Sequence, residues 1–381
     1  MVCFGTRPEV IKLAPLISLL NATAEFSVLA VTTGQHREML DQTLRTFHIR
    51  PDVDLRLMRH RQGLAELTSE AITALAGVMA EHRPDAVIVQ GDTTTAMCAG
   101  LAAHYEGVPV GHVEAGLRTN DPRNPFPEET NRRILSVLAR WHFCPTAQNA
   151  AALTRENVSL EAISVTGNTG IDALLEVARR NGTRARFVGH AQTRATRRIL
   201  VTLHRRETQG EVHRELARML GRVADREDVE ILFPVHLSPR VRESVFAELR
   251  GHPRVHLVDP LDYEAFVEAM RDSYLVVTDS GGIQEEAPVF GLPVVVMRET
   301  TERWEGVEAG SVVLSGTDHR QVEADVLRLL DNLDEYTRRS QAVNPYGDGN
   351  ASQRILVRLR HDLLGIETEV SEFAPVAKAS S

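Results

Sequence analysis

The chain has 381 residues, enough for two domains of ordinary size, and its 52 acidic residues outnumber its 43 basic residues to give a formal net charge of −9. An acidic balance without a basic block argues against a nucleic-acid partner and against an anionic membrane surface. Its cysteines (Cys3, Cys98 and Cys144) form no CxxC pair, so we expect neither a disulfide framework nor a metal site. Neither a signal peptide nor an apolar run of membrane-spanning length is visible, so we expect no membrane insertion and a cytoplasmic setting.

Short β-branched runs alternate with helical patterns in the first half of the chain. The predicted strands are residues 26–32, 53–57, 86–89, 108–113, 142–144 and 163–165. The predicted helices are residues 9–20, 37–47, 64–81, 93–105 and 127–139. Repeated alternation of strand and helix predicts a parallel sheet with helices on both faces.

The second half repeats this plan. Its predicted strands are residues 198–203, 230–235, 255–258, 274–278 and 293–297, and a polar, basic connection is expected at 181–197. We therefore predict an α/β fold of two Rossmann-like domains, residues 1–167 and 168–350, facing a cleft where ligands prefer to bind.

Three carboxylates stand where strands end or a helix begins. Asp92 follows the strand at 86–89, Glu114 follows the strand at 108–113, and Glu128 begins the helix at 127–139. Taken singly, an acid in such a place is more often a helix cap or a partner of the helix dipole. Because ligands of open α/β sheets bind outside the carboxyl ends of the strands, the combination indicates acid–base chemistry.

Two glycine-bearing turns predict anion binding. One precedes Arg7, whose guanidinium could reach a phosphate, and Lys12 lies one turn further on. The other is Ser280-Gly281-Gly282, where backbone N–H groups at a helix start suit an anion, although a plain tight turn is an equal alternative. Glu286 could accept hydrogen bonds from a ribose. No GxGxxG or GxxxxGK[ST] motif occurs, which argues against dinucleotide and Walker-type sites.

Further candidates stand near the ends of strands in the second half. His204 and His236 each end a strand, where imidazole could contact a pyrophosphate or serve as an acid, although such histidines are often only solvated. Arg303 is another phosphate candidate.

Four blocks resemble the non-hydrolysing UDP-N-acetylglucosamine 2-epimerases. They are VQGDTTTAMCAGLAAHYEGVPVGHVEAGLRT followed by PFPEETNR, and FGTRPE, QHREMLDQ and TDSGGIQEEAP. The similarity extends to about Leu364. It implies a GT-B-like fold in which the helix at 351–365 packs back on the first domain, a homodimer, and no metal or nicotinamide cofactor. This sequence departs from the family at two positions. The family usually has proline where Trp304 stands, which affects the expected shape of the loop carrying Arg303, and it has a smaller residue where Leu203 stands.

The resemblance also implies a reaction and roles. A base removes the C2 proton of UDP-N-acetylglucosamine as UDP leaves, and UDP re-adds to 2-acetamidoglucal with protonation on the other face, giving UDP-N-acetylmannosamine for cell-surface polysaccharide. The implied catalytic residues are Asp92, Glu114, Glu128 and His204, with the face served by each acid left open. The implied substrate-binding residues are Arg7, Lys12, Phe266, Ser280, Gly281, Gly282, Glu286 and Arg303.

The family binds UDP-N-acetylglucosamine at a second, activating site as well. The positions implied here are Gln35, Arg61 and His236, with Glu38 where some members carry glutamine. Judged from its neighbours alone, Arg61 would be only a solvated loop residue.

Other functions and boundaries stay open at this stage. A glycosyltransferase of the same fold, a hydrolysing 2-epimerase and a nucleotide-sugar sensor with a dead site are the alternatives. The intact acid-bearing blocks favour the non-hydrolysing epimerase over all three. Residues 366–381 are small and polar and are expected to be disordered. The family has a longer first strand, so either the native chain starts upstream of Met1 or this strand is short here.

Overall fold

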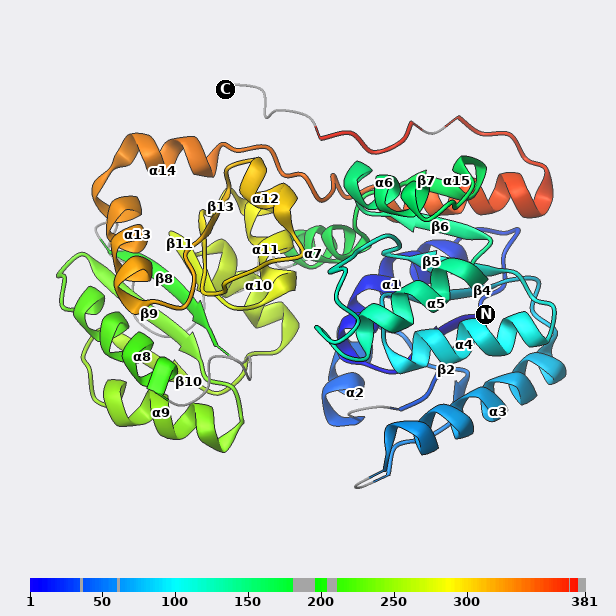
Figure 1. The fold of residues 1–381 in the computed structure, drawn as a ribbon, viewed down its shortest axis with the longest axis horizontal. Helices are drawn as coiled ribbons and strands as arrows, with labels where there is room; N and C mark the ends of the chain where they lie inside the picture. Colours follow the sequence, from blue (N-terminus) through cyan, green and yellow to red (C-terminus); the bar gives the residue numbers. More distant parts are fainter. Residues whose placement is uncertain (35–36, 60–61, 181–195, 204–210, 370, 376–381) are drawn as a thin grey trace. The chain divides into compact units, whose positions relative to one another are not determined.

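The computed structural model describes residues 1–34, 37–59, 62–180, 196–203, 211–369 and 371–375. The chain forms two compact units, which Figure 1 shows with one sheet in each. Unit 1 comprises Met1–Glu176 and Tyr346–Ala374, and unit 2 is built around Val177–Pro345. The predicted connection at 181–197 lies almost entirely outside the described residues.

Unit 1 contains a seven-stranded parallel sheet in the order β3-β2-β1-β4-β5-β6-β7, as far as the described residues go. Its strands are β1 (Val2–Phe4), β2 (Ala30–Thr32), β3 (Val53–Asp54), β4 (Val87–Gln90), β5 (Val110–Val113), β6 (Trp141–Cys144) and β7 (Ile163–Val165). Its helices are α1 (Arg7–Asn21), α2 (Arg37–Thr46), α3 (Leu64–His82), α4 (Thr94–Tyr105), α5 (Glu128–Leu138), α6 (Ala147–Arg155), η1 (Leu160–Ala162), α7 (Thr169–Arg180, which runs on into unit 2) and α15 (Ala351–Leu364).

Both faces of this sheet are covered, because successive strand residues point to opposite sides. Val87 and Val89 of β4 pack with α3, α4 and α5, whereas Ile88 between them packs with α1 and α15. The indole N–H of Trp141 donates to Asp362 of α15 at 2.6 Å, which fixes this helix against the sheet.

Unit 2 contains a six-stranded parallel sheet in the order β10-β9-β8-β11-β12-β13 among the described residues. Its strands are β8 (Arg197–Thr202), β9 (Val229–Pro234), β10 (Val255–Val258), β11 (Leu275–Thr278), β12 (Val294–Val296) and β13 (Val312–Leu314). Its helices are α8 (Glu211–Ala224), α9 (Pro239–Leu249), α10 (Tyr263–Arg271), α11 (Gly281–Glu286), η3 (Ala287–Phe290), α12 (Trp304–Glu308), α13 (His319–Asp331) and α14 (Leu333–Ser340). Two parallel α/β units confirm the predicted fold class.

Two predicted strands are too long and one strand was missed. The strand predicted at 53–57 is confined to β3, Val53–Asp54. The strand predicted at 26–32 is confined to β2, because β1 offers partners only from Val2 onward and Val2 pairs with Ala30. The sequence interpretation also passed over β13, which has three residues and pairs with β12.

The expected disorder after residue 366 is wrong for part of the tail. Phe373 is buried, its backbone N–H donates to Val165 at 2.8 Å, and Glu372 accepts from the backbone N–H of Val165. The guanidinium of Arg354 lies over the Phe373 ring. The tail therefore caps the exposed edge of β7, where unpaired backbone groups would otherwise need water.

No helix of the described chain is long and apolar enough to cross a membrane.

Candidate active site

The acid-bearing turns of unit 1 meet at one edge of its sheet. Strands β1, β4 and β5 are neighbours in the sheet and run parallel, so the turns after them emerge side by side. Arg7 begins α1 directly after the first of these turns, and the other two turns contain Asp92 and Glu114. The sheet order therefore brings together residues that the sequence separates by more than a hundred positions.

Asp92 is held by helix α5. Its carboxylate Oδ2 accepts from Arg132 Nε at 2.8 Å and from Arg132 Nη2 at 2.6 Å. Its backbone carbonyl accepts from the Asn131 side-chain amide at 2.8 Å. The carboxylate remains about a quarter exposed, with a side-chain exposure of 23%.

Glu114 adopts a left-handed backbone conformation with φ of 66°, which is uncommon for a residue with a side chain and is typical of functional positions. Its Oε2 accepts a hydrogen bond from Lys12 Nζ, and another from Gln90 Nε2 at 2.5 Å. Lys12 is therefore an ion-pair partner of Glu114 in this structure. The side chain of Glu114 is 10% exposed, so the pair is largely shielded from water.

Glu128 and Glu129 are adjacent at the start of α5 but differ in their hydrogen bonding. Glu129 is fully buried and accepts hydrogen bonds from the backbone N–H groups of Thr119 and Asn120 and from Arg132. Glu128 is half-buried, and its Oε2 is buried without a hydrogen-bond partner among the described residues. An unpartnered carboxylate oxygen is costly, so Glu128 is the acid best explained by a ligand.

Glu9, which the sequence interpretation passed over, joins two of these turns. Its Oε2 accepts from the backbone N–H groups of Gly5 and Thr6, and its Oε1 accepts from the Thr93 hydroxyl at 2.7 Å. Thr93 follows Asp92 and caps α4. Burial raises the pKa of the Glu9 carboxyl to about 7, against the hydrogen bonds that lower it. The Thr-x-x-Glu capping box is the sequence signal that could have identified this residue.

The glycine-rich turn of unit 2 (Ser280, Gly281 and Gly282) follows β11 and opens α11. The backbone N–H of Ser280 donates to the Thr278 hydroxyl, which is hydrogen-bonded to Thr202 on the neighbouring strand. A Cβ on Gly281 would lie 2.5 Å from Nη1 of Arg303, so packing explains this glycine. A Cβ on Gly282 would meet no atom of the described residues within 4 Å. The described part of the fold therefore gives no reason for glycine at 282.

Arg303 is nearly buried and paired with carboxylates. Its Nε donates to Glu285 at 2.8 Å, and its Nη1 lies 3.5 Å from Glu302. Although burial opposes it, the charges of Arg303 and Arg298 lower the pKa of Glu302 to about 2. Much of the positive charge of Arg303 is therefore neutralised within unit 2.

The remaining predicted site residues are placed as follows. Phe266 is half-buried on α10, and Glu286 accepts from the Tyr263 hydroxyl at 3.2 Å. His236 is exposed after β9, and its Nδ1 accepts from the Ser238 backbone N–H. The predicted residues Gln35, Arg61 and His204, and the side chain of Glu38, lie outside the described residues.

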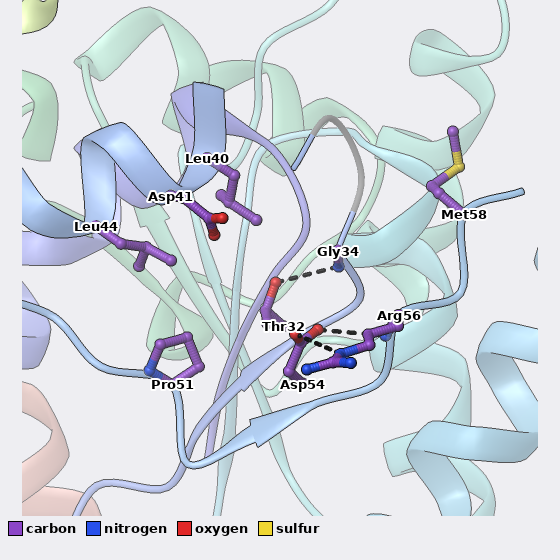
Figure 2. A pocket seen from close by; sticks show the side chains of 9 residues that line it. All are labelled: Thr32, Gly34, Leu40, Asp41, Leu44, Pro51, Asp54, Arg56 and Met58. Carbon is purple, nitrogen blue, oxygen red and sulfur yellow. Dashed lines mark hydrogen bonds and ion pairs between the residues drawn. The ribbon is translucent and has the colours of Figure 1, made fainter. Parts of the chain in front are cut away.

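A hollow of about 430 Å³ lies in unit 1, and Figure 2 shows the side chains that line it. Apolar side chains of α2 line one wall, and the ion-paired Asp54 and Arg56 lie opposite them. The lining residues are Thr32, Gly34, Leu40, Asp41, Leu44, Pro51, Asp54, Arg56 and Met58. In sequence, this lining flanks the predicted activator residues Gln35 and Arg61.

Metal-ligating clusters are not found among the side chains that the structure describes. Cys3, Cys98 and Cys144 are buried free thiols. The described residues at the two edges offer carboxylates, the half-buried Lys12 and a glycine-rich turn.

Comparison with solved structures places this fold in a class. S. aureus MnaA, solved with UDP, matches with a TM-score of 0.89 and 43% identity over 98% of this chain and 99% of its own. A Neisseria meningitidis UDP-GlcNAc 2-epimerase bound to UDP-GlcNAc matches with a TM-score of 0.88 and 40% identity over 95% and 99%. Acinetobacter baumannii MurG, 15% identical, shares the fold alone with a TM-score of 0.57. The protein is thus a two-domain α/β protein of the GT-B-like class.

Sequence comparison narrows the class to a family. A family model described as UDP-N-acetylglucosamine 2-epimerase matches residues 19–360. The UDP-N-acetylglucosamine 2-epimerase of Bacillus subtilis is 47% identical over 94% of this chain and 94% of its own length. The chain belongs to the UDP-N-acetylglucosamine 2-epimerase family, which confirms the resemblance found in its motifs.

Proposed function

We propose that this protein is an isomerase that interconverts UDP-N-acetylglucosamine and UDP-N-acetylmannosamine without net hydrolysis. The observation that carries the proposal is the acid cluster at one edge of the unit 1 sheet, in which a buried carboxylate oxygen of Glu128 has no hydrogen-bond partner within the described ranges. An epimerisation at C2 needs one group to remove a proton and another to return it on the opposite face. Family membership supplies the substrate class, because relatives bear this name.

The proposed reaction is an elimination followed by an addition. A carboxylate takes the C2 proton, the C2–H electron pair forms the C1=C2 bond, and the C1–O pair leaves with UDP to give 2-acetamidoglucal. UDP then re-adds at C1 as C2 is protonated on the other face. Asp92, Glu114 and Glu128 are the acid–base candidates, and Lys12 acts through its ion pair with Glu114.

We assign diphosphate binding to the turn at residues 280–282 together with Arg7 and His204. Support comes from Gly282, because glycine in a helix costs about 1 kcal/mol relative to alanine and no contact with a described residue requires it there. Close approach of a ligand to the backbone would explain it. Glu286 is assigned to the ribose and Phe266 to the base, with Arg303 holding the turn in shape.

The proposal extends to regulation and setting. UDP-N-acetylglucosamine would also bind as an activator through Gln35, Glu38, Arg61 and His236, the positions that the family resemblance implies. A ligand that prefers one conformation shifts the population toward it. We further propose a cytoplasmic homodimer that supplies UDP-N-acetylmannosamine for cell-surface polysaccharide. The free thiols fit a reducing compartment.

Proton NMR of the purified protein with UDP-N-acetylglucosamine in D₂O tests this function. We expect UDP-N-acetylmannosamine to appear, with deuterium at C2 of both sugars and no change of rate in EDTA. Free N-acetylmannosamine with stoichiometric UDP would instead identify a hydrolysing enzyme. Binding without turnover would identify a sensor, and turnover with full retention of protium at C2 would contradict proton exchange at the carboxylate.

The activator is tested by following pure UDP-N-acetylmannosamine. We expect a lag that trace UDP-N-acetylglucosamine abolishes, and Arg61→Ala should raise the activator concentration required while sparing UDP binding. Immediate full-rate conversion would show that the activating site is absent.

A further inference from the structure

Arg132 links the candidate acid Asp92 to the helix that begins with Glu128. It lies in the second turn of α5, with a side-chain exposure of 6%. Its Nε and Nη2 both donate to Oδ2 of Asp92, at 2.8 and 2.6 Å. Its remaining terminal nitrogen, Nη1, donates to Glu129 at 3.1 Å. The guanidinium is thus held from both sides.

The Glu129 end of this link is anchored. Glu129 is fully buried, and the backbone N–H groups of Thr119 and Asn120 donate to its two oxygens at 3.0 and 3.2 Å. Although burial opposes the effect, the neighbouring carboxylates Asp92 and Glu129 raise the pKa of Arg132, so the guanidinium stays a cation. A fixed cation between two carboxylates restricts the rotation of both side chains.

We propose that Arg132 is a positioning residue that fixes the Asp92 carboxylate relative to Glu128, so that the two acids act on the same substrate atom. This rests on the proposed function, in which Asp92 and Glu128 are acid–base groups. Asn131 holds the backbone of Asp92 at 2.8 Å, and Arg132 holds its carboxylate. One rigid helix therefore sets the spacing of two reacting groups on separate elements. Effective catalysis depends on such placement, and a shift of about 1 Å costs roughly a hundredfold in rate.

The neighbouring Arg133 provides a matched control. It lies on the same helix and donates to the same Glu129 at 3.2 Å, yet it is 45% exposed, and its other described partners are Asn120 and Glu156 rather than Asp92. Loss of Arg133 removes a charge and a Glu129 contact without releasing Asp92. A difference between the two arginines therefore isolates the contact with Asp92.

The test compares kcat, KM and UDP affinity in Arg132→Ala, Arg132→Lys and Arg133→Ala. Arg132→Ala should lower kcat by about a hundredfold with KM and the UDP dissociation constant within about twofold. Arg133→Ala should stay within about twofold of the parent. Arg132→Lys keeps the charge but lacks the planar guanidinium, so its kcat should lie between those of Arg132→Ala and Arg133→Ala. If Arg132→Ala does not fold, the comparison is made with Arg132→Lys instead.

Two further measurements separate positioning from general destabilisation. In the Asp92→Asn background, Arg132→Ala should lower kcat by less than about threefold, because a residue acting through Asp92 has nothing left to position. Guanidinium added at low concentration should raise the turnover of Arg132→Ala at least about tenfold above its turnover in sodium chloride of the same ionic strength. It should not accelerate Arg133→Ala.

These outcomes decide the inference. Full additivity with Asp92→Asn, or equal losses in Arg132→Ala and Arg133→Ala, would overturn it. If the parent protein does not epimerise UDP-N-acetylglucosamine, the proposed function fails first. An active parent with an unaffected Arg132→Ala leaves that function standing and removes Arg132 from it.

Discussion

The candidate sites of the two units differ in how their charged side chains are paired. In unit 1 the acids Asp92 and Glu114 are each held by a nearby cation, and one carboxylate oxygen of Glu128 has no hydrogen-bond partner in the part of the chain that the structure describes. In unit 2 the cation Arg303 is paired with Glu285 and Glu302 and supports a glycine-rich turn. The side chains of unit 1 are suited to proton transfer, whereas the backbone of unit 2 is suited to holding an anion. The position of a charged residue in the sequence does not reveal which of these roles it has.

The largest expected effect tests the proton-transfer half of this comparison. Glu128→Gln and Glu114→Gln should each lower turnover by roughly 10²-fold or more, because general acid–base groups contribute about 10²–10⁴-fold. The UDP dissociation constant, measured by calorimetry, should stay within about twofold. Loss of UDP binding with normal turnover at saturation would reverse the division of labour between the units.

The second effect concerns the stability cost of the buried carboxyl of Glu9. A carboxyl that titrates near 4.5 when unfolded and near 7 when folded binds more protons in the folded state between these values. The free energy of unfolding should therefore fall as pH rises through this window, by about 3 kcal/mol relative to Glu9→Gln.

Urea unfolding at several pH values measures this difference. Trp141 lies buried in unit 1, so a Trp304→Phe background makes fluorescence report on that unit. Buried histidines contribute equally to both variants and cancel. If the free energy of unfolding varies with pH in the same way for the parent and Glu9→Gln, Glu9 keeps its ordinary pKa. Ionisation of Glu9 would then cost unit 1 no stability.

Sequence patterns predicted the architecture and the turns but not the contacts within them. Strand ends at Gln90 and Val113 place Asp92 and Glu114 correctly, because the carboxyl ends of parallel strands share an edge. The pairs Lys12–Glu114 and Arg132–Asp92 join residues 102 and 40 positions apart. Nothing local in the sequence specifies such pairs, since they depend on the sheet order.

Burial explains the other gaps in the sequence interpretation. Glu9 and Glu129 look like ordinary first-turn helix acids, yet both are fully buried. Glu9 accepts from the Thr93 hydroxyl 84 positions away, and Glu129 accepts from backbone N–H groups of the turn at 119–120. Phe373 looks like part of a disordered tail until β7 is seen to need an edge partner. In each case packing against a distant segment overrides a local pattern.

A third prediction tests the anion-binding half of the comparison with two adjacent glycines. Gly282→Ala should weaken UDP binding about tenfold or more, because an added methyl in a filled site costs about 1–3 kcal/mol. The same substitution should leave the urea unfolding midpoint unchanged or raise it, because alanine is the better helix former. Gly281→Ala should instead destabilise unit 2, since its methyl would collide with Arg303. Calorimetry with UDP and urea unfolding distinguish the two. Unchanged UDP affinity in Gly282→Ala would exclude this turn as the phosphate site.

The smallest effect concerns Trp304, where the family usually has proline. Trp304 is the first residue of α12 and is 47% exposed. Proline is favourable at a first helical position because its φ is already suitable for a helix and no intrahelical N–H bond is lost. Arg303, just before it, is held in place by Glu285. Trp304→Pro should therefore raise the free energy of unfolding by about 0.4–1 kcal/mol and leave turnover and UDP affinity within about twofold. Circular dichroism in urea and a UDP titration measure both quantities. A large loss of UDP affinity would show that the indole ring contributes directly to the nucleotide site, and unit 2 would then bind its anion with more than backbone groups.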